Sequence, residues 1–307
     1  MKKTNRSAKP NKQNTLFVRV FRWLFFTVLF IFLLLISLYF FVFPSIVKND
    51  ISQKNIVIVS SKLDSNSKNI YLAHISEDQS ENNLYLINAE SQVLVPGGYG
   101  EYPLQSVYQL LVIDKKDTQF IKSVYSELLG ISVDEVLALN TPLDNISDSE
   151  LSTFFFSSAL KNISQFKFNS FDVIKLHYQV KDMSVLELAS IKDIEKHYSD
   201  LSTISGDLYQ YCSVAVVNAT SQNGLARKIG KTVENTGALV VRFDDSEMKQ
   251  ERTQIYYADD PIDCSKMAEK VLGIFSEKPE ILPLGKLKNE QQYRAKTVII
   301  VGGSTLK

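Results

Sequence analysis

Hydrophobic residues along this chain form one long run and many short ones. The long run, Trp23–Phe43, spans 21 residues, of which only Thr27 and Ser37 are not strongly apolar. A helix of this length can cross the roughly 30 Å hydrocarbon core of a bilayer. We therefore predict a transmembrane helix at residues 23–43, with a cleaved signal segment or a buried helix as the alternatives.

Charge is distributed unevenly around this run. Residues 1–22 carry seven basic side chains and no acidic one, although the whole chain has 34 basic and 34 acidic residues. Basic residues before a span favour a cytoplasmic N-terminus. The sequence predicts a basic cytoplasmic tail (1–22), a single-pass anchor in membrane lipid, and an extracytoplasmic remainder. Because that remainder is net acidic, nucleic-acid binding is disfavoured.

Short apolar segments at strand spacing follow the predicted anchor and give way to helical spacing near residue 104. The predicted strands are 56–59, 70–75, 84–87, 93–95 and 134–139. Apolar positions at intervals of three and four predict helices between 104 and 129, ending at Gly130. We also predict helices at 148–160 and after a capping box at Ser184, and a linker at 199–206. These elements predict an α/β domain over residues 55–205.

The last hundred residues have a more regular pattern. Strands are predicted at 213–218, 238–243, 253–257 and 297–301, with a small extra strand at 281–284 and helices at 224–235 and 263–275. The order β-α-β-β-α-β is typical of the split βαβ, or ferredoxin-like, arrangement. We expect an antiparallel sheet with both helices on one face, over residues 212–304. The overall class is α/β (α+β).

Residues 216–220, Val-Val-Asn-Ala-Thr, and the later Gly224-Leu225-Ala226 resemble a known signature. It is the V-x-N-x-T and G-L-A pattern that opens the LytR C-terminal domain of cell envelope proteins. The resemblance continues through 238–243 and 253–257 to the closing strand at 298–303. It implies a cell envelope protein.

Residues 55–205 show a fainter resemblance, to the LytR/CpsA/Psr domain, which transfers glycopolymers from a polyprenyl pyrophosphate carrier to peptidoglycan. It rests on residues 80–87, 94–98 and 128–134. The resemblance implies one catalytic candidate, Glu81, near the family's metal-binding Asp. Gly97 and Gly98 occupy the places of its Arg and Asp. Pyrophosphate binding requires guanidinium groups, and no arginine lies between residues 23 and 226. We therefore expect a scaffold that has lost the transferase.

The turn after the predicted strand 213–218 supplies the candidate ligand-binding residues. They are Asn218, Thr220, Asn223, Gly224 and Arg227. Free N–H groups at the start of the following helix could receive an anion. The alternative, which the scarcity of nearby basic residues favours, is that these residues only build the turn and cap the helix.

Metal and cofactor chemistry has little basis in the sequence. The three histidines are not spaced as metal ligands, and we expect neither a metal nor a cofactor. Cys212 and Cys264 are the only cysteines; we interpret them as two buried thiols, with a disulfide as the alternative.

Together these features predict a membrane-anchored, extracytoplasmic envelope protein without catalytic activity, which binds or organises wall glycopolymer or an envelope protein. One alternative is a residual glycopolymer phosphotransferase acting on a polyprenyl-pyrophosphate-linked substrate. Another is a protein–protein interaction module that uses a sheet edge.

Overall fold

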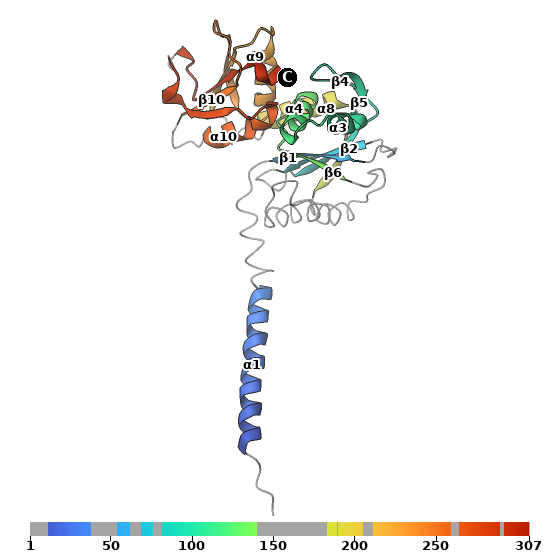
Figure 1. Ribbon diagram of the computed structural model, residues 1–307, viewed down its shortest axis with the longest axis vertical. Coiled ribbons are helices and arrows are strands. Elements are labelled where there is room, and N and C mark those ends of the chain that lie inside the picture. Colours follow the sequence, from blue (N-terminus) through green and yellow to red (C-terminus); the bar gives the residue numbers. More distant parts are fainter. Residues whose placement is uncertain are drawn as a thin grey trace, which may run out of the picture. The chain divides into compact units, whose positions relative to one another are not determined.

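The computed structural model divides into two compact units, residues 1–51 and 52–307 (Figure 1). It describes residues 12–37, 54–61, 69–75, 82–139, 183–188, 190–204, 211–258, 264–288 and 292–306. The first unit contains helix α1 (Lys12–Ser37). Within the described part of the chain, no helix combines the length and apolar character that crossing a membrane requires. Residues 38–43 of the predicted span lie outside the described residues.

The second unit begins with a five-stranded sheet in the order β6-β1-β2-β3-β7. Its strands are β1 (Lys54–Ser60), β2 (Asn69–Ile75), β3 (Asn83–Asn88), β6 (Glu135–Leu139) and β7 (Ser184–Leu188). The central strand β2 is antiparallel to both β1 and β3, whereas β6 and β7 run parallel to their neighbours β1 and β3. Side chains on both faces of β1 and β2 are buried, which makes this sheet an internal layer.

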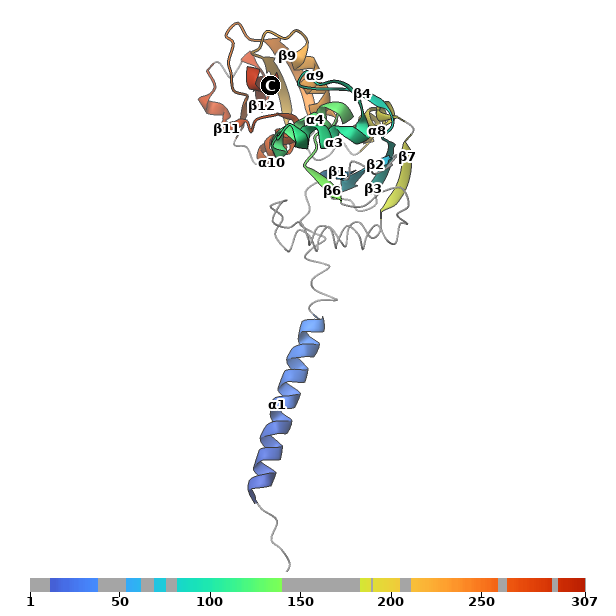
Figure 2. The same cartoon turned by 45° about the vertical axis from the view of Figure 1, so that its right-hand side comes forward.

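Three helices cover one face of this sheet (Figure 2). They are α3 (Leu104–Ile113), α4 (Thr118–Leu129) and α8 (Ile191–Ile204). A hairpin of β4 (Gln92–Val95) and β5 (Gly100–Pro103) precedes α3. The caps of α4 follow from its sequence: the Asp117 side chain accepts a hydrogen bond from the Phe120 N–H (2.8 Å), and Gly130 ends the helix in the left-handed conformation (φ 68°).

Two predictions in this region are wrong. Ser184 does not open a helix but begins β7, which pairs with β3 about a hundred residues earlier in the chain. The local capping-box pattern cannot reveal such a distant partner. The predicted linker at 199–206 is helical up to Ile204, because α8 continues through it. The helix predicted at 148–160 lies outside the described residues.

The C-terminal part is a second five-stranded sheet, in the order β11-β10-β12-β8-β9. Its elements, in chain order, are β8 (Ser213–Asn218), α9 (Leu225–Glu234), β9 (Leu239–Asp245), β10 (Gln254–Tyr257), α10 (Cys264–Lys270), η3 (Val271–Ile274), β11 (Glu280–Pro283), η4 (Leu284–Lys286), β12 (Thr297–Val301) and η6 (Gly303–Leu306). The predicted order of strands and helices, including the small strand near 281, is confirmed.

The predicted ferredoxin-like pairing is wrong. A split βαβ unit would place another strand between β8 and β9, but these two are adjacent and parallel, and only β10 and β12 pair antiparallel. The sheet therefore contains two ordinary βαβ units, β8-α9-β9 and β10-α10-β11, which run in opposite directions and lead to opposite edges. The order of elements along the chain is the same in both arrangements, so the sequence pattern could not separate them.

Both helices of this sheet lie on one face, as predicted. Since βαβ crossovers are right-handed, two units that point in opposite directions and move to opposite edges place their helices on the same side. One core accordingly contains side chains from α9, α10 and the helix-facing side of the sheet. Its members include Val216, Leu225, Ile229, Val233, Met267, Ala268, Val271 and Ile299.

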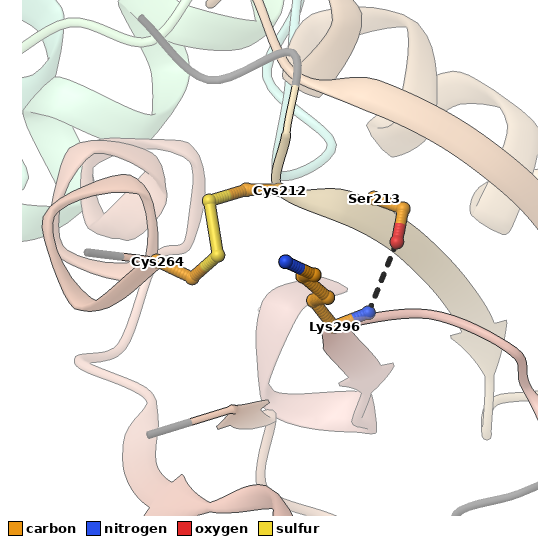
Figure 3. Close-up of a disulfide and its surroundings, with 4 residues drawn as sticks. All are labelled: Cys212, Ser213, Cys264 and Lys296. Carbon is orange, nitrogen blue, oxygen red and sulfur yellow. Dashed lines mark hydrogen bonds between the residues drawn. A yellow bond between two sulfur atoms is a disulfide. The ribbon is translucent and has the colours of Figure 1, made fainter. Parts of the chain in front are cut away.

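A disulfide joins the start of β8 to the start of α10 (Figure 3). Cys212 and Cys264 are 52 residues apart, with their Cα atoms 5.6 Å from each other, and both are buried. Our preference for two free thiols was therefore wrong. Because β10 runs opposite to β8, the residues that follow β10 return to the end of the sheet where β8 begins. Beside this bond, the Lys296 N–H donates to Ser213 Oγ (3.1 Å) at the start of β12.

We expect reduction of this disulfide to lower the free energy of unfolding by about 2–4 kcal/mol, because it releases a loop of about fifty residues in the unfolded chain. Urea unfolding with and without dithiothreitol measures the change. A Cys212→Ala/Cys264→Ala variant serves as the control and should not respond to dithiothreitol. An unchanged wild-type midpoint, at a reductant concentration that frees two thiols, would contradict this expectation.

Candidate functional site

The turn after β8 uses the side chains of Asn218 and Thr220 for its own structure. Asn218 Oδ1 accepts from the Thr220 N–H (3.0 Å) and from Thr220 Oγ1 (2.7 Å). Its Nδ2 donates to the Gln222 carbonyl and to Asp245 Oδ1, both at 2.9 Å. Both residues are buried. They tie the end of β8 to the end of β9, which favours the turn-building interpretation of these two residues.

The other candidates separate into those on the surface beside α9 and those elsewhere. Asn223, Gly224 and Arg227 are exposed, and Gly224 precedes α9 in the left-handed conformation (φ 78°) without a side-chain cap. Glu81 lies outside the described residues. No group of three or more His, Cys, Asp or Glu side chains that could hold a metal occurs among the residues described.

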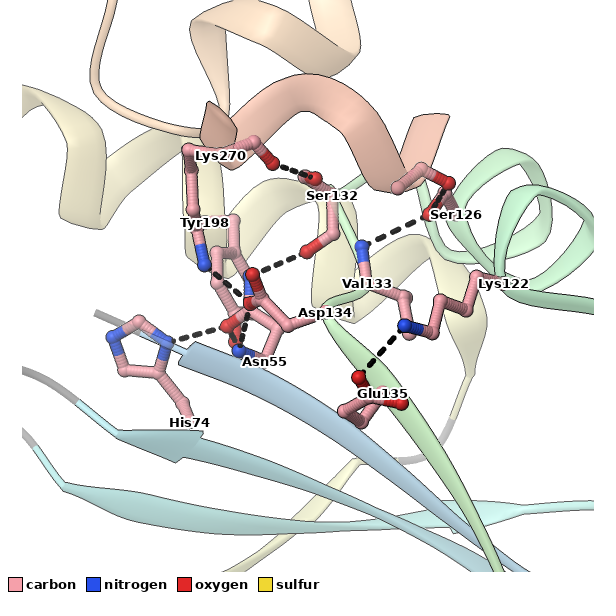
Figure 4. Close-up of polar contacts among 11 residues, drawn as sticks. Asn55, His74, Lys122, Ser126, Ser132, Val133, Asp134, Glu135, Tyr198 and Lys270 are labelled. Carbon is pink, nitrogen blue, oxygen red and sulfur yellow. Dashed lines mark hydrogen bonds and ion pairs between the residues drawn. The ribbon is translucent and has the colours of Figure 1, made fainter. Parts of the chain in front are cut away.

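A buried polar seam joins the two sheets of the second unit (Figure 4). Lys270, at the end of α10, forms an ion pair with Asp134, just before β6. The Lys270 side chain is only 4% exposed, and burial lowers its pKa. Asp134 Oδ2 also accepts from the Asn55 N–H (2.7 Å). Burying an ionised group without its ion-pair partner is costly. The pair therefore fixes the position of the two sheets relative to each other.

The same seam caps the end of α10 and η3. Oγ of Ser132 donates to the Lys270 carbonyl (2.5 Å), Ser126 Oγ donates to the Gly273 carbonyl (3.0 Å), and Gln119 Nε2 donates to the carbonyls of Leu272 and Phe275 (2.8 and 2.7 Å). Carbonyls at a helix end have no partner within the helix. Here side chains from the other sheet's domain supply the partners.

Close packing accompanies these hydrogen bonds. A Cβ atom on Gly273 would lie 2.1 Å from the Val133 carbonyl oxygen, so no larger residue fits without a shift of the backbone. The Val133 N–H in turn donates to Ser126 Oγ (2.9 Å). The seam therefore depends on the absence of a side chain at residue 273.

His74 belongs to the buried end of the seam. Its Nδ1 lies 2.8 Å from Asn55 Oδ1, which also accepts from the Tyr198 hydroxyl (3.0 Å). Because a carboxamide oxygen can only accept, Nδ1 carries the proton. Burial, together with the nearby charge of Lys270 and with His197, lowers the pKa of His74 to about 3. The ring is therefore neutral at physiological pH and acts as a structural donor.

Two adjoining cavities form a groove beside α9, and we call this groove the α9 groove. The described residues that line the wider cavity, about 550 Å³, include the basic side chains of Lys192, Arg227, Lys228 and Lys231 and the acidic side chain of Glu127. The narrower cavity, about 190 Å³, is lined by apolar side chains such as Phe120 and Leu225 and by polar ones such as Ser123 and Gln222. Glu127, Lys228 and Thr232 line both cavities.

The charged residues of the groove come from the domains of both the first and the second sheet. Arg227, Lys228 and Lys231 project from α9, and Lys192 from α8. Lys228 Nζ lies 2.5 Å from Glu127 Oε1 on α4, with side chains 54% and 41% exposed. Four basic groups around a concave surface attract anions, all the more since residues 23–307 are net acidic as a whole.

Residues 212–305 match the family described as LytR cell envelope-related transcriptional attenuator. They form a LytR C-terminal domain. This confirms the resemblance found from residues 216–220 and 224–226. Searches of the curated proteins and of the solved structures give no match to the chain. The resemblance of residues 55–205 to LytR/CpsA/Psr proteins remains a prediction.

The LytR C-terminal domain contributes α9 to the groove, and sequence reasoning found only part of this site. Gly224 and Arg227, two of the predicted candidates, line the wider cavity. Lys192, Lys228 and Lys231 were missed as a group, because Lys192 is about forty residues away in the chain and joins the others only when the two domains pack. The spacing of Arg227 and Lys231, four residues apart on one helix face, was the available signal.

Packing at the seam predicts the effect of Gly273→Ala. We expect a loss of about 2–3 kcal/mol in the free energy of unfolding, because the new methyl group collides with the Val133 carbonyl. Gly285→Ala is the matched control, since a Cβ there meets nothing within 4 Å. Urea unfolding of both variants gives the comparison. Equal stability of the two would show that the seam tolerates a side chain at residue 273.

The pKa of His74 predicts a dependence of stability on pH. Between about pH 6.5 and pH 3 the unfolded state binds the His74 proton and the folded state does not, so stability is present above pH 6.5 and falls as the pH decreases. This group alone should remove about 2–3 kcal/mol between pH 7 and pH 4.5. His74→Gln should therefore lose less stability on acidification than wild type does. Parallel curves of unfolding free energy against pH would contradict the prediction.

Proposed function

We propose that this chain is a membrane-anchored, extracytoplasmic protein of the cell envelope that binds an anionic wall glycopolymer without transforming it. The LytR C-terminal domain supports the link to the cell envelope. The α9 groove is the observation that carries the binding proposal, because it concentrates four basic side chains in a net acidic region.

Three features support the anchor and its orientation. The apolar run Trp23–Phe43 has the length that a bilayer requires. The seven basic residues before it favour a cytoplasmic N-terminus. The Cys212–Cys264 disulfide is of the kind that persists in oxidising compartments, which suits an extracytoplasmic position for the LytR C-terminal domain.

Two features support binding rather than transfer. No arginine between residues 23 and 226 is available to fork onto a pyrophosphate. The β4–β5 turn, where the resemblance would place the family's Arg and Asp, contains Gly97 and Gly98 with φ of 85° and 82°. Residues with side chains are strained in this conformation. This turn lines the narrower cavity through Pro96 and Gly97, and neither residue carries a charge.

The proposal predicts that the full chain in sealed right-side-out vesicles binds labelled poly(glycerol phosphate) added outside. Lys192→Gln/Arg227→Gln/Lys231→Gln should weaken this binding roughly 10- to 100-fold, because exposed ionic contacts contribute about 0.5–1 kcal/mol each. The measurement is equilibrium binding at several salt concentrations. Added salt should weaken the wild type more than the variant, because charge attraction is screened.

The matched control removes the same charge elsewhere. Lys278→Gln/Arg252→Gln/Lys286→Gln changes three exposed basic residues outside the α9 groove. Equal losses in both triple variants would contradict a localised site, and binding only in inside-out vesicles would contradict the orientation. Transfer of glycan from a polyprenyl-pyrophosphate donor with Mg²⁺ would contradict the non-catalytic role.

A further inference from the structure

The Glu127–Lys228 ion pair occupies a special position in the α9 groove. Both residues line the wider and the narrower cavity, so the pair stands where the two cavities meet. It also connects the two domains, because Glu127 is on α4 and Lys228 is on α9. A chain-like ligand that fills both cavities has to pass this pair.

We propose that the Glu127 carboxylate occupies the position beside Lys228 that a phosphate of the bound ligand takes, and that the ligand displaces this carboxylate. The ligand is a polymer in which phosphates alternate with sugar or polyol units. This inference rests on the proposed function and names its ligand class. A phosphate is an oxyanion, as a carboxylate is, and accepts the same charge-assisted hydrogen bonds from a lysine ammonium.

The energetics permit such an exchange. With side chains 41% and 54% exposed, the Glu127–Lys228 pair is of the solvent-screened kind that contributes little to stability. By contrast, the Lys270–Asp134 pair of the seam is largely buried and remains in place. The groove can therefore release Glu127 without opening the interface between the domains.

The two cavities differ in the way that such a polymer requires. Beyond the pair, the wider cavity offers Lys192, Arg227 and Lys231 to a second phosphate. On the other side, the narrower cavity offers the half-buried ring of Pro96 together with the exposed side chain of Gln222. Sugars and polyols present both C–H faces and hydroxyls, which suit apolar and hydrogen-bonding surfaces together. A uniformly charged polymer would leave these uncharged groups of the narrower cavity without a matching partner.

Removal of the carboxylate tests the inference. In the vesicle assay, Glu127→Gln should bind poly(glycerol phosphate) about 3- to 5-fold more tightly, as expected when a competing contact of up to 1 kcal/mol is lost. Glu101→Gln, which makes the same change of charge at an exposed residue outside the groove, should leave the affinity unchanged. Lys228→Gln added to Glu127→Gln should remove the gain.

Two further measurements identify the ligand class and check that the variants are folded. Polyglutamate, a carboxylate polymer without polyol units, should bind both wild type and Glu127→Gln more weakly than poly(glycerol phosphate) does. Equal affinities for the two polymers would overturn the assignment to phosphate–polyol polymers. Glu127→Ala should reproduce the effect of Glu127→Gln, and thermal unfolding should show both variants folded.

The outcomes separate this inference from the proposed function. If wild type binds the polymer and Glu127→Gln binds it equally or more weakly, the exchange is wrong and the binding function stands. If neither protein binds the polymer, the binding function and the exchange are both wrong. A gain in both Glu127→Gln and Glu101→Gln would show a general charge effect and would also overturn the exchange.

Discussion

The end of α10 and η3 is the part of the second unit on which its other features depend. Helix carbonyls there have no partner within the helix, and the side chains of Gln119, Ser126 and Ser132 donate hydrogen bonds to them. The Lys270–Asp134 pair lies beside them. These contacts require α10 to approach the first sheet's domain closely, and Gly273 permits that approach.

This constraint explains why residues 52–307 form one compact unit although they contain two sheets. Each domain has its own hydrophobic core, but the polar groups at the seam are satisfied only when the two are together. Breaking the seam would expose paired charges and unsatisfied carbonyls. The disulfide acts at the opposite end of α10, where Cys264 is fixed to the start of β8. The helix is thus held at both ends, once within its domain and once across the seam.

The α9 groove is a consequence of the same docking. With α10 fixed against α4, the neighbouring helix α9 comes to lie beside α4, and Glu127 meets Lys228. Asn235, which follows α9, donates to the Gly130 carbonyl (2.6 Å) and fixes the other end of this contact. The groove therefore has walls from two domains, and its basic residues come from both. Without the first sheet's domain, the outer face of α9 would be exposed and would not form one side of a groove.

The local elements and the family of residues 212–305 could be predicted from the sequence. Apolar periodicity located α3, α4, α9, α10 and most strands, because side chains a few residues apart decide these elements. The conformation of Gly130 and the turn around Asn218 and Thr220 also followed from residue type. Tertiary structure alone decided the pairing of β7 with β3, the adjacency of β8 and β9, the Cys212–Cys264 bond and the grouping of Lys192 with Arg227 and Lys231. Each of these joins residues that are distant in the chain or strands whose order admits more than one arrangement, and their proximity is set by chain direction and packing rather than by local pattern.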